Sequence, residues 1–202
     1  MSAADLRQNE VAVEDAELVA QVQAGDEAAF TQLVRKYQQQ VFNLILYYTG
    51  NKNEVEDLAQ DVFVKVYTHL GNFETRATFR TWLYRITLNV CIDHARRRKL
   101  RRMLSLDGLS EWSRERLTFD LQATDTPEAH AERRELDEHI RRSIARLPED
   151  FRRVLVLRDL QELEYEEIAA ITGWSLGTVK SRLFRARRRM QQFLRPYVEE
   201  TQ

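Results

Sequence analysis

The most informative stretch of the sequence is residues 165–182, which read YEEIAAITGWSLGTVKSR. Ala169 is small at a position where two crossing helices must approach each other closely. Gly173 can adopt the left-handed backbone conformation that the turn between two such helices requires. Ser175 can accept a hydrogen bond from a free backbone N–H of the next helix. Together these residues predict a helix-turn-helix arrangement.

The helix that follows this turn combines an apolar face with a basic one. Its inner stripe consists of Val179, Leu183, Ala186 and Met190. Hydrogen-bond donors and cations occupy the outward positions near its start, namely Thr178, Lys180, Ser181, Arg182 and Arg185. A helix that reads DNA needs such donors for base edges and phosphates, and its N-terminus itself favours phosphate. We therefore expect a DNA-binding helix rather than a purely structural hairpin.

The rest of the chain is also predicted to be helical. Its 202 residues include only 6 Gly and 3 Pro, fewer than the frequent turns of an all-β fold usually need. Apolar residues recur at helical spacing in four segments, 13–24, 26–48, 53–70 and 78–102. The periodicity fades after them and resumes at Pro127. We predict an all-α protein with two small helical domains, 1–103 and 127–202, joined by an irregular linker at 104–126.

The apolar spacing also predicts helix N-caps and core residues within the first domain. Asp26 and Asn53 are the expected N-caps of the second and third helices, because each precedes an apolar periodic segment. Val13 and Tyr67 fall on the apolar stripes of the first and third helices, so we expect them to face the core.

Charge is strongly segregated along the chain, although the formal net charge is only −1. Residues 79–103 carry eight basic residues against the single acid Asp93. Residues 178–195 carry seven basic residues and no acid. Residues 1–30 and 104–150 carry an excess of acids. One basic run alone is compatible with a solvated helix face, but two runs separated by an acidic segment indicate a polyanion that is held at two places.

Several functional classes are disfavoured by the residues that the sequence lacks. A single cysteine, Cys91, excludes an internal disulfide and a cysteine zinc site. The four histidines share no metal-ligand spacing with one another or with Cys91, and no glycine-rich phosphate loop or nucleophile elbow occurs. We therefore expect no enzymatic activity, metal or cofactor. No apolar run reaches the length of a membrane span and no signal peptide is recognisable, so a soluble, cytoplasmic protein is expected.

The helix expected at 78–102 carries a second candidate surface for nucleic acid. Its core stripe consists of Phe79, Leu83, Ile86 and Val90. The other faces combine aromatic, amide and charged side chains, namely Arg80, Trp82, Tyr84, Arg85, Asn89, Asp93, Arg96 and Arg97. Aromatic rings can stack on unpaired bases while arginines neutralise the backbone. Alternatively, Trp82 and Tyr84 belong to the core and the arginines are only solvated.

Three further stretches, together with the helix-turn-helix, resemble one protein family. They read DLAQDVF at 57–63, FRTWLYRITLN at 79–89 and DHARRR at 93–98. In this order they are similar to bacterial RNA polymerase sigma factors of the sigma-70 family. The two-domain layout resembles the small extracytoplasmic-function (ECF) group, and the resemblance extends from about Val13 to Leu194.

The resemblance implies a transcription initiation factor without enzymatic activity. Its first domain, region 2, would bind the clamp of core RNA polymerase and would recognise and open the −10 promoter element. Its second domain, region 4, would bind the β flap and read the −35 element, so that the β and β′ subunits and promoter DNA are the implied partners. The linker would be threaded through the polymerase. No extra domain is available to mask the DNA-binding faces, which suggests a separate anti-sigma factor.

The family's motifs also imply roles for individual residues. The clamp contacts match Asp57, Gln60, Asp61 and Phe63. The −10 contacts match Arg80, Trp82, Tyr84, Arg85, Asn89, Asp93, Arg96 and Arg97. The −35 contacts match Ser175, Thr178, Lys180, Ser181, Arg182, Phe184, Arg185 and Arg188, although Phe184 could equally be a core residue.

The main alternative is an ordinary helix-turn-helix regulator with a helical sensor domain. It would account for residues 165–190, but it would leave the basic run at 79–103 and the match at 57–63 unexplained. Co-purification with core polymerase would discriminate between the two, because a repressor does not need it.

Overall fold

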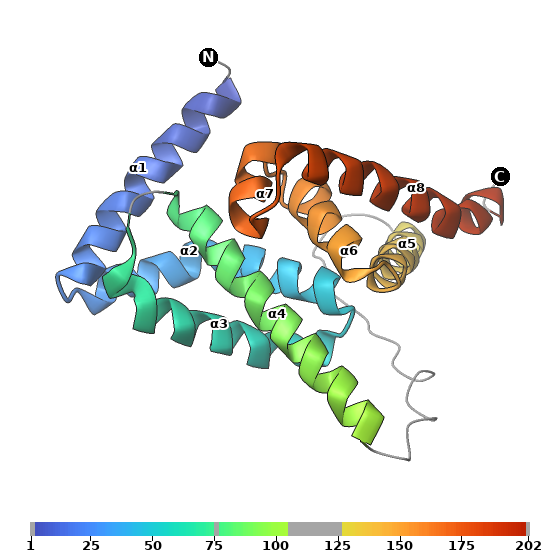
Figure 1. Ribbon diagram of the computed structural model, residues 1–202, viewed down its shortest axis with the longest axis horizontal. Coiled ribbons are helices and arrows are strands. Elements are labelled where there is room, and N and C mark those ends of the chain that lie inside the picture. The colour runs from blue at the N-terminus through green and yellow to red at the C-terminus, as the bar shows by residue number, and fades with distance from the viewer. Residues whose placement is uncertain (1–2, 75–76, 105–126, 201–202) are drawn as a thin grey trace.

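The fold is wholly helical over the residues that the computed structural model describes, which are 3–74, 77–104 and 127–200 (Figure 1). This confirms the predicted all-α class. Residues 105–126, which make up nearly all of the predicted linker, lie outside the described part of the chain.

The first domain is built around its second helix. Its four helices are α1 (Ala3–Gln23), α2 (Glu27–Thr49), α3 (Val55–His69) and α4 (Phe79–Leu104). Helix α2 packs against each of the other three, and its buried side includes Leu33, Val41, Leu44 and Ile45. These positions recur at intervals of three, four and eight, which is the spacing of one helix face. Short 3-10 turns, η1 (Lys52–Glu54) and η2 (Leu70–Asn72), flank α3.

The ends of α2 follow from single residues. The carboxylate of Asp26 accepts hydrogen bonds from the backbone N–H groups of Ala28 and Ala29, at 2.8 and 3.3 Å, which confirms the predicted cap. Gly50 ends the helix with a left-handed φ of 69°. The predicted cap Asn53 is wrong. The side chain of Asn51 instead accepts from the Asn53 N–H at 3.0 Å, because a 3-10 turn intervenes before α3 begins.

Helix α1 is attached to α2 by a buried polar cluster. Asp15 is buried, accepts a short hydrogen bond from the hydroxyl of Tyr37, and lies 2.8 Å from the ammonium of Lys36. Since Asp15 faces inward, Val13 is turned to the other side of the helix and is exposed. The prediction that Val13 belongs to the core is therefore wrong.

The second domain consists of four helices, α5 (Pro127–Ala145), α6 (Glu149–Leu155), α7 (Tyr165–Thr172) and α8 (Leu176–Glu200). Helix α6 continues into one wider π turn, η3 (Val156–Leu160). Helices α6 and α8 pack closely against each other, and α7 lies across α8 at the turn around Gly173. The buried residues of α8 are the predicted Val179, Leu183, Ala186 and Met190.

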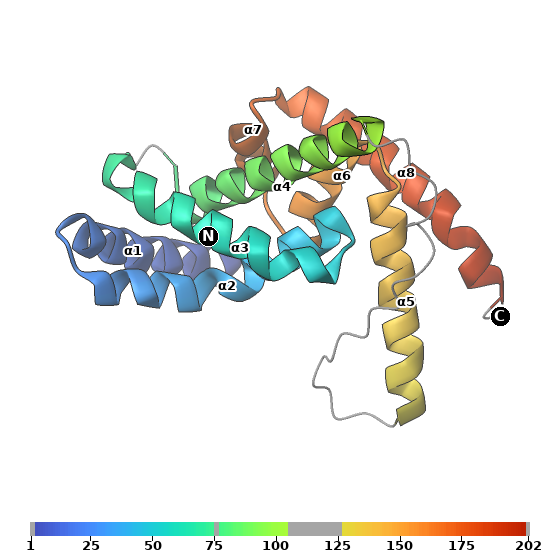
Figure 2. The same cartoon turned by 90° about the horizontal axis from the view of Figure 1, so that it is seen from below.

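The two domains lie against each other, as Figures 1 and 2 show from two directions. Helix α7 packs on α4, while α5 and η3 pack on α2. The hydroxyl of Tyr47 donates to Asp137 at 2.6 Å, and the guanidinium of Arg152 donates to the carbonyl of Tyr48 at 2.9 Å. The buried apolar residues of both domains form one continuous cluster. The domains therefore share an interface that covers part of α4.

Candidate polymerase and nucleic-acid interfaces

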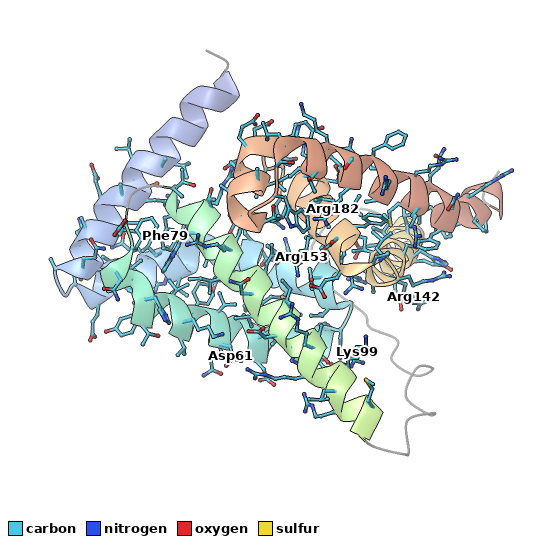
Figure 3. All side chains as sticks on the ribbon, in the orientation of Figure 1. Asp61, Phe79, Lys99, Arg142, Arg153 and Arg182 are labelled. Carbon is cyan, nitrogen blue, oxygen red and sulfur yellow. The ribbon has the colours of Figure 1, made fainter. Side chains whose placement is uncertain are left out.

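Helix α3 presents an outer face that mixes acids with apolar side chains. Asp57, Gln60 and Asp61 are exposed, and Figure 3 shows Asp61 on the outer side of the helix. Leu58, Ala59 and Val62, which alternate with them, are buried and hold the helix in place. The predicted clamp residue Phe63 is half-buried against the core cluster.

Two apolar residues extend the same outer face. Val64 is 60% exposed and Tyr67 is 52% exposed. They follow Asp57, Gln60 and Asp61 at helical spacing, so all five share one side of α3. The prediction that Tyr67 is a core residue is wrong, because its ring contacts Phe30 edge-on at a centroid distance of 4.9 Å and leaves its other side open. An acidic face with exposed apolar residues is suited to binding another protein.

Much of the predicted −10 surface lies along one exposed side of α4. Arg85, Asn89, Arg96 and Arg97 are exposed, and Asp93 is half-buried. The intervals from Arg85 to Asn89 to Asp93 to Arg97 are four residues each, which places these four in a row along the helix. The row combines an amide and an acid with guanidinium groups, and so it offers both donors and acceptors to a nucleic acid.

The predicted contacts at the start of α4 are covered in this arrangement. Tyr84 is only 2% exposed, and its burial raises the pKa of its hydroxyl to about 12. The guanidinium of Arg80 forms an ion pair with Glu167 of α7 at 3.0 Å. The expectation that Tyr84 is open to unpaired bases is wrong for this arrangement, because its side chain is buried where α2 and the second domain meet α4. The alternative, that Tyr84 is a core residue, is the one that the structure supports.

Trp82 occupies an intermediate position. It is half-buried, and its ring lies 5.0 Å from that of Phe73 and 5.9 Å from that of Phe79. Part of the indole is thereby fixed against the end of the first domain, while the remainder is accessible. This agrees with its sequence position at the boundary between the core stripe and the outer faces.

The helix-turn-helix has the predicted geometry. Gly173 has a left-handed φ of 73°, and its N–H donates to the carbonyl of Ala169 at 2.9 Å. The hydroxyl of Ser175 accepts from the Thr178 N–H at 3.2 Å and lies 2.9 Å from the Thr178 hydroxyl. Ser175 therefore caps α8 and holds Thr178 beside the helix N-terminus.

Most of the predicted −35 contacts are exposed on α8. Lys180, Ser181, Arg185 and Arg188 are open to solvent, and Phe184 is 68% exposed. The alternative that Phe184 is a core residue is therefore wrong. The face that results is a run of cations interrupted by one aromatic ring.

Arg182 differs from its neighbours, because it is held within the domain. Its guanidinium carbon lies 3.7 Å from the ring centroid of Trp174, and one of its nitrogens lies 2.9 Å from a carboxylate oxygen of Asp150. Arg153 approaches the same ring at 5.8 Å. The expectation that Arg182 projects freely toward base edges is wrong in this structure, because Trp174 in the turn and Asp150 on α6 engage it. Sequence reasoning missed Trp174, for which the only signal is a large aromatic residue inside a turn.

The described part of the chain holds no group of three or more His, Cys, Asp and Glu side chains able to bind a metal. Cys91 is fully buried, which raises the pKa of its thiol to about 12 and keeps it protonated. Among the described helices, none is long and apolar enough to cross a bilayer.

Comparison with known proteins identifies the family. Residues 33–101 match Sigma-70 region 2, and residues 137–190 match Sigma-70, region 4. The chain belongs to the sigma-70 family. It is 39% identical over 189 residues to the RNA polymerase sigma-H factor of Pseudomonas aeruginosa, covering 93% of this chain and 97% of that protein. It is 37% identical over 186 residues to the ECF RNA polymerase sigma-E factor of Haemophilus influenzae, covering 90% and 96%.

A solved structure has a similar fold. The sigma factor RpoE from Bartonella quintana, in complex with the anti-sigma factor NepR, is similar with a TM-score of 0.67 and 25% identity, covering 82% of this chain and 96% of that one. The present chain is thus an ECF sigma factor of transcription initiation. Region 2 of this sigma factor comprises most of α2 together with α3 and α4, and region 4 contains the DNA-binding helix-turn-helix.

Proposed function

We propose that this sigma factor binds core RNA polymerase through the outer face of α3 and directs it to promoters through two basic surfaces. The first surface, on α4, recognises and opens the −10 element, and the second, on α8, reads the −35 element. The observation that supports this most strongly is the presence of two exposed cationic helix faces, one on each domain, beside a face of α3 on which the exposed carboxylates Asp57 and Asp61 accompany apolar side chains.

Core binding is assigned to α3 on grounds of charge and exposure. Asp57 and Asp61 are exposed without being needed for packing, so their charges are available to cations on the polymerase clamp. Val64 and Tyr67 add apolar surface that a protein partner can bury. Region 4 would contact the β flap, and core polymerase is therefore the principal protein partner.

Promoter opening is assigned to the row on α4. Asn89 can hydrogen-bond the edge of a base that has left the stack, and Arg85, Arg96 and Arg97 can neutralise the adjoining phosphates. On α8, Lys180, Ser181 and Arg185 lie near the helix N-terminus, where a recognition helix contacts base edges. Promoter recognition and opening require polymerase and genomic DNA, so the protein would act in the cytoplasm.

The arrangement of the two domains is relevant to regulation. In this arrangement Arg80 is paired with Glu167 of α7 and Tyr84 is buried, so a movement of α7 away from α4 would free the Arg80 guanidinium for DNA. The Bartonella quintana relative was solved with an anti-sigma factor. We include an anti-sigma factor among the partners of this chain, because a protein that stabilises the arrangement seen here would keep part of the −10 surface covered.

The experiment that tests the proposal is transcription in vitro. Core polymerase alone and core polymerase with the full chain are compared on genomic fragments, and start sites are mapped. Specific start sites that appear only with the chain, each preceded by common −10 and −35 sequences, are the expected result. Fragment-specific DNA binding without any polymerase-dependent transcript would refute it and would instead indicate an ordinary regulator.

Core binding is tested separately with a charge reversal. Asp61→Arg should abolish pull-down of core polymerase, because it places a cation against a cationic clamp while leaving the buried side of α3 unchanged. Glu17→Arg reverses an acid on α1 that is also exposed and serves as the matched control. Equal core binding by the two variants would contradict the assignment to α3.

A further inference from the structure

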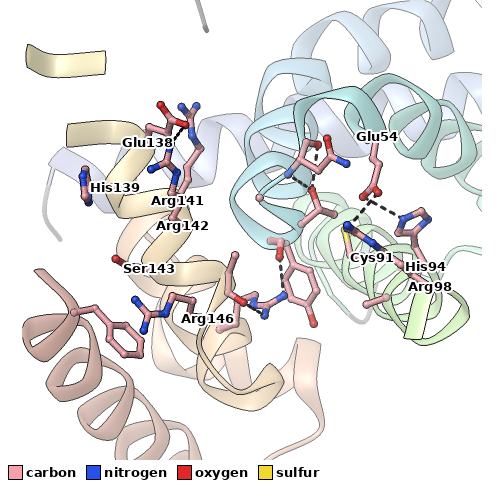
Figure 4. Close-up of a pocket in the computed structure, with 18 of the residues that line it drawn as sticks. Glu54, Cys91, His94, Arg98, Glu138, His139, Arg141, Arg142, Ser143 and Arg146 are labelled. Carbon is pink, nitrogen blue, oxygen red and sulfur yellow. Dashed lines mark hydrogen bonds and ion pairs between the residues drawn. The ribbon is translucent and has the colours of Figure 1, made fainter. Parts of the chain in front are cut away.

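A cavity of about 740 Å³ lies between the two domains, and neither domain forms it alone. Figure 4 shows α4 on one side, with His94 and Arg98, and α5 on the other, with Arg141 and Arg142, followed by Arg146 just after the end of α5. The volume is within the range of cavities that bind small molecules, which is roughly 300–1,000 Å³.

The lining of this cavity is rich in cations. Six Lys and Arg side chains contribute to it, against two carboxylates, those of Glu54 and Glu138. Glu54 already binds His94 at 3.1 Å and Arg98 at 3.4 Å, and Glu138 is engaged by Arg142. Arg141 is paired with Asp137 at 2.9 Å. Half of the lysine and arginine side chains that line the cavity, Arg98, Arg141 and Arg142, are thus paired with a nearby carboxylate.

Three cations around the cavity are left without a carboxylate partner in the described part of the chain. Lys99 is exposed at the α4 side. Arg146, on the segment that follows α5, lies with its guanidinium 4.6 Å from the ring centroid of Phe193. Arg152 donates only to main-chain carbonyls, those of Tyr48 at 2.9 Å, Leu147 at 3.1 Å and Ala145, and its Nε has no hydrogen-bond partner.

We propose that this cavity binds a small polyphosphorylated anion, which Lys99, Arg146 and Arg152 contact from both domains at once. Guanidinium groups match phosphate oxygens with paired, charge-assisted hydrogen bonds, and an ammonium group adds a mobile point charge. An anion with several negative charges in a compact volume supplies the counter-charge that the lining lacks. Burial lowers the pKa of the Arg152 guanidinium, although Tyr48 and Glu149 act in the opposite direction, and a bound anion would favour its charged form further.

The position of the site gives the ligand a regulatory consequence. A ligand that touches both domains binds the arrangement seen here more tightly than one in which the domains are apart, so it shifts the population toward this arrangement. In this arrangement Tyr84 is buried and Arg80 is paired with Glu167. Binding would therefore oppose use of the −10 surface. This consequence rests on the proposed function, whereas binding of the anion does not.

The experiment is calorimetric titration of the full chain with inorganic tripolyphosphate at constant ionic strength, without polymerase or DNA. One molecule should bind per chain. Arg146→Glu and Lys99→Glu should each weaken binding about tenfold or more, because each replaces one charge-assisted contact by a repulsion. Arg35→Glu makes the same change on an exposed part of α2 outside the cavity and should leave binding unchanged. Thermal melts establish that all three variants fold.

The possible outcomes distinguish the proposed site from binding by one domain alone, from general attraction between anions and cations, and from binding of any polyanion. Binding that Arg146→Glu weakens but Lys99→Glu does not would overturn contact with both domains. Equal weakening by Arg35→Glu, or by Arg185→Glu on the DNA-binding face, would show general attraction to cations and overturn the site. Citrate that binds as tightly as tripolyphosphate would overturn the assignment to phosphate. A titration with ATP shows whether the ligand is a nucleotide or an inorganic polyphosphate. If ATP binds more tightly than tripolyphosphate, the cavity must also contact the nucleoside. Because no polymerase is present, none of these results depends on sigma activity.

Discussion

The ion pair between Arg80 and Glu167 should favour the closed arrangement, in which α7 packs on α4, over an open arrangement in which the two domains are apart. Its atoms lie 3.0 Å apart, and the two side chains are 25% and 23% exposed, so it is shielded better than an ordinary surface pair. We assign it about 1 kcal/mol, the upper end for partly solvated pairs, which corresponds to about a fivefold change in an equilibrium constant. Glu167→Gln should therefore lower the ratio of closed to open arrangements about fivefold.

The substitution is chosen so that it leaves the start of α7 intact. The Glu167 carboxylate also accepts a hydrogen bond from the Glu164 N–H at 2.9 Å, and the glutamine oxygen can still accept it. Glu166→Gln removes an exposed charge from the adjacent position and is the matched control. The assay is a distance distribution between spin labels at Gln38→Cys and Gln191→Cys, both exposed, with Cys91 protected by burial.

The closed distance should lose population in Glu167→Gln but not in Glu166→Gln. Raising the salt concentration to about 1 M should reproduce part of the effect in the unsubstituted chain, since the pair is only partly buried. Identical distributions for wild type and Glu167→Gln would refute the inference that this pair holds α7 on α4.

Three further predictions concern the DNA-binding surfaces. Asn89→Ala should change the free energy of unfolding by less than about 0.5 kcal/mol, because the residue is exposed. It should impair transcription from duplex promoters, and transcription should recover on templates that are already unpaired at −10. Equal defects on both templates would argue against a role in opening. Arg185→Ala should reduce the discrimination between bases at particular −35 positions by about 1–3 kcal/mol. Arg188→Ala should instead weaken binding to all sequences and lower the slope of log affinity against log salt concentration by about one. Both are measured by binding to a library of −35 sequences. Arg182→Ala should reduce the melting temperature and weaken binding to all −35 sequences alike, because it frees Trp174 and leaves Asp150 unpaired; a selective change in base preference with an unchanged melt would show that Arg182 reads bases directly.

The sequence alone determined the helical class, the helix-turn-helix and the family. Apolar spacing and capping are local properties, so residues such as Asp26, Gly173 and Val179 carry their structural role within a few positions of themselves. The same holds for the exposed rows on α3 and α8, because a residue that lies off an apolar stripe is turned outward by the helix itself.

Prediction from local sequence was less reliable where the result depended on the type of turn before a helix or on which element packs against it. Asn53 lost its predicted capping role to Asn51, because a 3-10 turn precedes α3. Tyr67 has the spacing of a core residue, but the first domain does not extend far enough to cover its ring. Spacing identifies a face, whereas the element packed against that face determines how much of it is buried.

Only the tertiary structure decided which DNA-binding candidates are available. Tyr84 is buried, Arg80 is paired with Glu167, which lies 87 residues further along the chain, and Arg182 is held by Asp150 and Trp174. The cavity also exists only because residues of α4 and α5 are brought to its two sides. No periodicity within a helix encodes these contacts, because docking depends on the summed shape and charge of two surfaces that are distant in sequence.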